Sequence, residues 1–139
     1  MAMEVTIRAA VEAYRNGEDE APFTALIELE GDIVPALAQL FDTEADPDVR
    51  AFLVRVAWER REHDSANLIV EALHDPMEEV WQSALDGSIA LASPAILDIL
   101  HKAKLQERAD AEMARRFQIC LDEAILYVEG LLRGAQYPY

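Results

Sequence analysis

Apolar residues recur at intervals of three and four positions along nearly the whole chain, and this spacing is what most constrains the fold. Such a period places apolar side chains on one face of an α-helix. Prolines, glycines and aspartates divide the pattern into eight segments. We expect helices over residues 4–15, 22–30, 33–42, 47–61, 65–74, 77–91, 94–104 and 107–132. No run alternates apolar and polar residues as a half-buried strand does, so the sequence predicts an all-α protein.

Local signals mark the ends of several expected helices. Asp32 and either Asp64 or Ser65 stand before periodic apolar residues, where helix-capping side chains are common. The acidic run 18–20 is expected to form a solvated loop. The last helix carries an unbroken apolar stripe. At ~1.5 Å per residue it would be about 39 Å long, enough to lie along the whole stack. Gly134 is expected to end it before a short tail.

Length and composition predict a single domain over residues 1–139. The chain is 52% hydrophobic, which is enough to build a buried core. No apolar run is long enough to span a bilayer, and the first residues lack the basic and apolar regions of a signal peptide. A single cysteine, Cys120, excludes an internal disulfide. We therefore expect a cytoplasmic protein.

The chain is strongly acidic, with 27 acidic and 12 basic residues and a net charge of -15. Such a surface repels phosphate groups, which argues against nucleic-acid binding and against binding to anionic membranes. A basic protein partner would be attracted, and its association would slow as salt rises. Simple solubility is the other explanation of the charge.

Two of the expected helix starts resemble each other. They are Asp46-Pro47-Asp48-Val49-Arg50 and Asp75-Pro76-Met77-Glu78-Glu79-Val80-Trp81. In each, a helix ends in apolar residues, an Asp-Pro turn follows, and the next helix carries an acid, a valine and a large side chain. The two valines are 31 residues apart, a separation typical of stacked helical repeats. The repeat is clearest over residues 32–91.

Asp46, Val49 and Arg50 match the pattern of the HEAT-like (armadillo-type) repeat family, in which an Asp-containing turn and a following Val-Arg mark the second helix. The chain resembles this family, which implies an α-solenoid of antiparallel helix pairs that binds other proteins without an activity of its own. The second copy departs from the pattern, since Trp81 stands at the arginine position. The end units match only in layout, as terminal repeats often do.

The sequence contains no motif that predicts catalysis. His63-Asp64 is similar to the His-Asp pair of metal-dependent phosphohydrolases, but no histidine precedes it, and a capping role for Asp64 explains it. The three histidines lack the spacing of zinc ligands. Cys120 lies on the apolar stripe of the last helix and is expected to be a buried thiol. We therefore expect no catalytic residue, no metal site and no cofactor.

The acidic residues concentrate in residues 62–101, where 40 consecutive positions hold eight acids and no lysine or arginine. This stretch predicts an uncompensated negative patch, although a solvated face would explain it as well. The residues expected to bind a partner are Glu71, Asp75, Glu78, Glu79, Trp81 and Asp86. For Trp81 we favour a core position, and it would serve as an aromatic anchor only if its ring is exposed.

These observations lead to a functional hypothesis. We expect a non-catalytic protein-binding module whose acidic face covers a basic protein partner. Its most concrete form is an inhibitor or immunity-type protein that masks a basic enzyme such as a nuclease toxin. The alternative is a structural or adaptor HEAT-like scaffold, or a homodimer or larger homo-oligomer formed through the long last helix.

Overall fold

The computed structural model describes residues 2–136 and shows eight α-helices and no strand over that range. The all-α prediction is confirmed. The expected tail, Tyr137-Pro138-Tyr139, lies outside the described residues. The helices are α1 (Ala2–Arg15), α2 (Glu20–Glu28), α3 (Val34–Thr43), α4 (Pro47–Arg60), α5 (Ser65–Leu73), α6 (Glu78–Ala90), α7 (Pro94–Ala103) and α8 (Ala111–Gln136).

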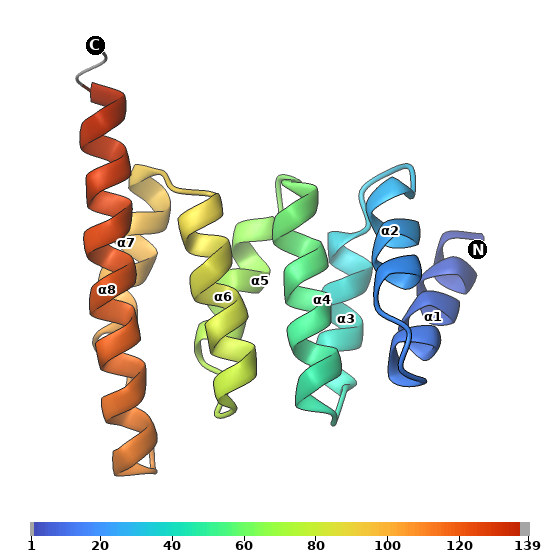
Figure 1. Cartoon of the computed structure of the whole chain (residues 1–139), viewed down its shortest axis with the longest axis horizontal. Coiled ribbons are helices and arrows are strands. Elements are labelled where there is room, and N and C mark those ends of the chain that lie inside the picture. Colours follow the sequence, from blue (N-terminus) through green and yellow to red (C-terminus); the bar gives the residue numbers. More distant parts are fainter. Residues whose placement is uncertain (1, 137–139) are drawn as a thin grey trace.

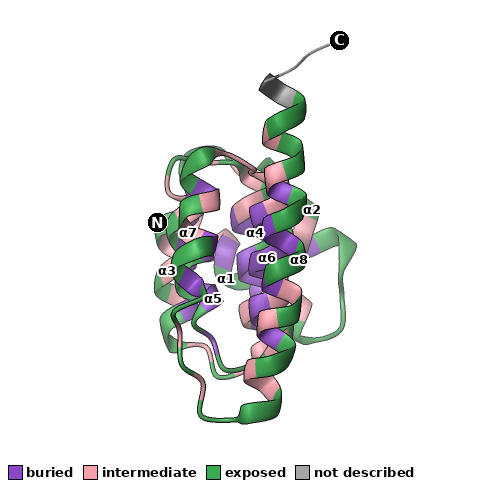
Figure 2. Cartoon of the chain, turned by 90° about the vertical axis from the view of Figure 1, so that its left-hand side faces the viewer, coloured by how far each residue is buried: buried purple, intermediate pink, exposed green. Residues whose placement is uncertain are grey.

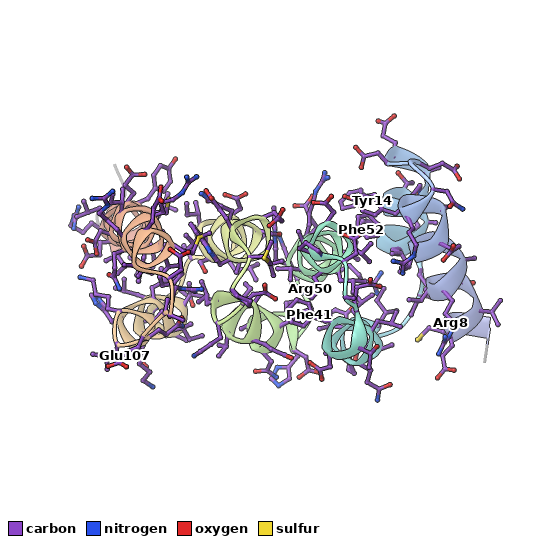
Figure 3. All side chains as sticks on the ribbon, turned by 90° about the horizontal axis from the view of Figure 1, so that it is seen from below. Arg8, Tyr14, Phe41, Arg50, Phe52 and Glu107 are labelled. Carbon is purple, nitrogen blue, oxygen red and sulfur yellow. The ribbon has the colours of Figure 1, made fainter. Side chains whose placement is uncertain are left out.

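The helices lie side by side in two layers that form a row (Figure 1, Figure 3). One layer contains α2, α4, α6 and α8, and the other contains α3, α5 and α7. At the N-terminal end, α1 packs against α2 and α4. A single buried apolar cluster extends between the layers from Ile7 to Val128, and Figure 2 shows its residues on the inner sides of the helices.

The last helix differs from its expected bounds at both ends. It begins at Ala111, because Arg108 binds the carbonyls of Leu73 and Asp75 and so holds the preceding segment out of the helix. The side chain of Asp110 then caps the helix by accepting the N–H of Met113 at 3.0 Å. The helix continues past Gly134 to Gln136, so the expected stop at the glycine is wrong.

Two of the expected helix caps are also wrong. The first N–H groups of α3, those of Ile33 and Val34, are bound by the carboxylate of Glu62, at 3.2 and 3.1 Å, and not by Asp32. Asp64 precedes α5 but makes no capping hydrogen bond. The cap of α3 thus comes from a residue distant in sequence, which the packing of α3 against α4 brings to the start of the helix.

The two similar helix starts share one local geometry. Asp46 accepts the N–H of the residue two positions on at 2.9 Å, and Asp75 accepts the N–H of Met77 at 3.0 Å. Arg50 joins these turns. Its guanidinium binds the carbonyls of Glu44 and Ala45 before α4, and it holds the carboxylate of Asp75 before α6 at 2.9 and 3.1 Å. Such a two-pronged contact fixes both distance and orientation.

Arg60 and Arg108 join other parts of the row in the same manner. Arg60 donates to Glu62 and to the carbonyls of Leu26, Ile27, Leu29 and Gly31, which lie at and beyond the end of α2. The guanidinium of Arg108 lies 4.0 Å from the ring centroid of Phe117. Terminal helix carbonyls have no partner within their own helix, so these side chains satisfy groups that would otherwise be buried unpaired.

The packing of α4 against α6 requires a glycine. A Cβ atom at Gly87 would lie 2.6 Å from two ring atoms of Trp58, well inside van der Waals contact. Because the ring is wedged between helices, the extra methyl group would force these two helices apart.

We therefore predict that Gly87→Ala destabilises the protein by about 1–3 kcal/mol in a urea unfolding experiment. Alanine ordinarily stabilises a helix interior by roughly 0.5–1 kcal/mol, so the expected sign is reversed. Gly134→Ala is the control, since no atom lies within 4 Å of its Cβ position. A stabilised Gly87→Ala variant would contradict the close approach of the two helices.

We also predict that Arg60→Met destabilises the protein by about 3–5 kcal/mol, because it leaves Glu62 and several buried carbonyls without a partner. Thermal and urea unfolding followed by circular dichroism measure the loss. Arg8→Met should change stability by less than about 0.5 kcal/mol, because Arg8 is exposed and makes no ion pair among the described residues. Similar losses in both variants would show that the buried contacts contribute little.

Candidate protein-binding site

Two residues expected at a partner-binding surface are buried. Trp81 packs edge-on against Phe117, with ring centroids 5.2 Å apart, and its side chain is fully enclosed. Its core position, which the sequence favours, is the one observed. Asp75 is buried in the ion pair with Arg50. Neither side chain is accessible to a partner, so the expectation that they contact one is wrong.

Four of the eight acids in residues 62–101 pair with cations, and all four of these cations lie outside that stretch. Its ion pairs are Glu62 with Arg60, Asp75 with Arg50, Glu78 with Arg116 and Asp98 with Lys102. Burial alone would raise the pKa of Glu62, but hydrogen bonds from Arg60 and two backbone N–H groups lower it below its ordinary value. The prediction of an uncompensated stretch is therefore wrong for half of these acids, because the fold brings cations from outside the stretch to them. Asp64, Glu71, Glu79 and Asp86 form no ion pair among the described residues.

Glu71 lies apart from the other predicted residues. It is on α5, in the layer opposite to α6, and it faces Asp42 of α3. Hydrogen bonding to the carboxyl group of Asp42, with burial and like charge, raises the pKa of Glu71 to about 7. Two carboxyl groups this close share a proton more readily than they hold two negative charges.

Glu79 and Asp86 remain exposed on one face of α6, seven residues apart. Asp86 lines a groove of about 240 Å³ between α6 and α8, together with Gln82, Cys120 and Tyr127. Partial desolvation in this groove raises the pKa of the Asp86 carboxyl. The thiol of Cys120 is half-buried rather than enclosed, and it accepts a hydrogen bond from Gln82 at 3.4 Å. The contacts of the described residues do not show whether Glu78, Glu79 or Asp86 binds a partner, so that role stays a prediction.

A stronger concentration of free carboxylates lies at the other end of the row. A hollow of about 300 Å³ opens between the α1–α2 loop and the turn before α4. We name it the acidic hollow, and define it by Tyr14, Glu18, Asp19, Asp46 and Asp48. Figure 3 shows Tyr14 beside Phe52 at the junction of α1 with α4.

Local structure positions each side of the acidic hollow. The ring of Tyr14 stacks on Phe52, with centroids 4.0 Å apart and planes inclined by 16°. Gly17 has a φ of +99°, a conformation that glycine adopts without strain, and there the chain leaves α1. Asp19 stands at the N-cap of α2 but makes no side-chain capping bond, so its carboxylate is left to face the hollow.

Negative charge dominates the electrostatics of the acidic hollow. Burial raises the pKa of Tyr14, and the nearby charges of Asp48, Asp19 and Asp46 raise it further, while the positive charge of Arg55 lowers it. Within the described residues, no lysine, arginine or histidine forms an ion pair with any of the four carboxylates. Arg15 lines the same hollow, but its guanidinium is bound to Glu44 at 2.7 Å.

The carboxylates of the acidic hollow have uneven roles in the fold itself. Asp46 caps α4, and Asp48 lies in its first turn, where a negative charge stabilises a helix. The side chain of Glu18 makes no hydrogen bond or ion pair that the described part of the chain shows. An aromatic face ringed by carboxylates is suited to a guanidinium or ammonium group, through ion pairs and a cation–π contact.

Sequence reasoning missed this site. The sequence predicts a solvated loop over residues 18–20, and it indicates only a helix start at Asp46. The two acidic segments are more than 25 residues apart, and only the packing of α1 against α4 brings them together. The one signal available in advance was an aromatic residue, Tyr14, close to an acidic run.

Other kinds of site can be assessed over the same residues. Across the described residues, no group of three or more histidine, cysteine, aspartate or glutamate side chains could hold a metal ion. None of the described helices combines the length and the apolar character needed to cross a membrane. Comparisons with protein-family models, curated proteins and solved structures find no match to this chain.

The Asp42–Glu71 pair leads to a prediction about pH. Because the folded-state pKa of Glu71 is raised from 4.5 to about 7, its contribution to stability is complete below about pH 4.5 and is lost as pH rises through 7. Glu71→Gln should therefore be more stable than the wild type at pH 8, and the difference should shrink toward pH 4. Urea midpoints across this range measure it. Glu107→Gln, in an exposed loop, is the control, and equal behaviour of the two variants would contradict the shared proton.

Proposed function

We propose that this chain is a non-catalytic protein-binding module that binds a basic protein partner through the acidic hollow. The observation that carries the proposal is the set of four carboxylates around Tyr14 without a cationic partner among the described residues. A protruding arginine or lysine of the partner would occupy the hollow. The net charge of -15 would steer such a partner toward the surface.

The architecture supports a binding role of this kind. The two-layer row of helices and the matched turns before α4 and α6 favour an α-solenoid of antiparallel helix pairs, similar to HEAT-like repeats. In such folds each unit contacts mainly its neighbours, and the row presents extended surfaces. Glu79, exposed in the first turn of α6 next to α4, would extend the contact beyond the hollow.

The most specific form of the proposal is an inhibitor in the cytoplasm that masks a basic enzyme, as immunity-type proteins do. An inhibitor of this kind needs a rigid surface of opposite charge and no reactive groups of its own. The buried arginine contacts provide rigidity at the helix ends close to the hollow, since Arg50 is anchored beside Asp46. Fast association driven by charge would suit the capture of a harmful enzyme.

The test uses a defined cationic probe, a short unstructured peptide with two arginines. We predict that it shifts the NMR signals of the Tyr14 ring and that its affinity falls as salt rises from 0.02 to 0.3 M. The double variant Asp19→Asn/Asp48→Asn should bind about tenfold more weakly, since exposed ion pairs contribute up to about 1 kcal/mol each. Both substitutions keep the side-chain shape.

The control is Glu28→Gln/Glu107→Gln, which removes the same number of charges from exposed positions outside the hollow. If both double variants lose affinity equally, the peptide responds to net charge and the hollow is not a site. A pull-down from the source cells then examines the natural partner. A basic protein captured by the wild type and the control, but not by the Asp19/Asp48 variant, would support the proposal.

A further inference from the structure

The last helix exposes apolar side chains at the end of the row. Its inner face packs on α6 and α7 through Phe117, Leu121 and Val128. On its opposite face, Ile119 is 55% exposed and Leu126 is 67% exposed. Figure 1 shows α8 as the outermost helix and shows that it extends past α7. Large apolar side chains aligned on one helix face are typical of a surface that another helix covers.

The exposed residues belong to a regular row with a charge at each end. Glu112, Ile119, Leu126 and Arg133 follow one another at intervals of seven, so they lie along one side of the helix. We name these four residues the outer row. In the described part of the chain, neither Glu112 nor Arg133 makes an ion pair. The order of side chains along the row is therefore acid, apolar, apolar, base, and neither charged residue is held in an ion pair.

We infer that a second copy of this chain covers the outer row, with the two α8 helices antiparallel and related by a two-fold axis. A half-turn about the point midway between Asp122 and Glu123 places Ile119 opposite Leu126 of the partner subunit. The same rotation places Glu112 opposite the partner's Arg133. The surface is complementary to itself, as a two-fold interface requires. A different protein would have to match both the apolar and the charged positions independently.

Charged residues beside the outer row favour this alignment of the two α8 helices on one side and disfavour it at the centre. Arg115 and Glu129 lie about seven residues on either side of the same midpoint, and neither forms an ion pair among the described residues. In the antiparallel arrangement Arg115 approaches Glu129 of the partner subunit. At the centre, Asp122 is neutralised by Lys104 at 3.3 Å, whereas Glu123 would face its own copy. The interface is therefore weakened by one identifiable repulsion.

The test is sedimentation velocity at 10–300 µM protein and 0.15 M salt, where close charge pairs act and distant ones are screened. The wild type should show a concentration-dependent monomer–dimer equilibrium. Leu126→Gln should raise the dissociation constant at least tenfold, while Leu105→Gln, at a side chain 82% exposed outside α8, should leave it unchanged. Glu123→Gln should lower the dissociation constant, because it removes the central repulsion.

Charge exchange tests the register. Glu112→Arg and Arg133→Glu should each weaken the dimer about fivefold or more, and the two changes together should restore it. A monomeric wild type and a monomeric Glu123→Gln variant at 300 µM would overturn the inference. If Leu126→Gln leaves the dissociation constant unchanged, the interface lies elsewhere. If the charge exchanges leave it unchanged, the two α8 helices do not pair in this register. None of these changes touches the acidic hollow, so this inference and the proposed function can fail separately.

Discussion

Partly buried arginine side chains bound to helix-end carbonyls are the interaction on which the rest of this structure depends. Arg50, Arg60 and Arg108 each reach from one helix or loop to the end of another, where backbone carbonyls lack partners in their own helix. A guanidinium is suited to this position because it offers several donors in one plane and stays charged. The two-layer row is thus stabilised by polar contacts at helix ends as well as by the apolar cluster between the layers.

Because these arginines pair with particular acids, they determine which carboxylates remain available to a partner. With few cations in the chain, several of them are committed to structural ion pairs such as Arg50–Asp75 and Arg60–Glu62. The acids that pair with them are removed from any binding surface. Among the described residues, four acids without an ion pair lie close together around Tyr14 in the acidic hollow. The four such acids of residues 62–101 are instead spread over α5, α6 and the turn before α5.

The parts predicted well were those set by neighbouring residues. The helical period of the apolar residues predicted all eight helices, and the two Asp-Pro starts do share one geometry. The predictions that were wrong concern contacts between residues far apart in the sequence. Glu62, and not the local Asp32, caps α3, and Arg108 delays the start of α8. Local preferences contribute about 1 kcal/mol each, so packing can override them.

The sequence by itself determined the class of fold, the division into helices and the overall acidity. Periodicity and turn residues are properties of short segments, and the net charge is a sum over all residues. Only the tertiary structure decided which charges are free. The exposure of Asp19, the burial of Asp75 and the exposed outer row of α8 depend on which helices meet. Electrostatic and apolar surfaces are made by residues far apart in sequence, and no local pattern specifies which of them come into contact.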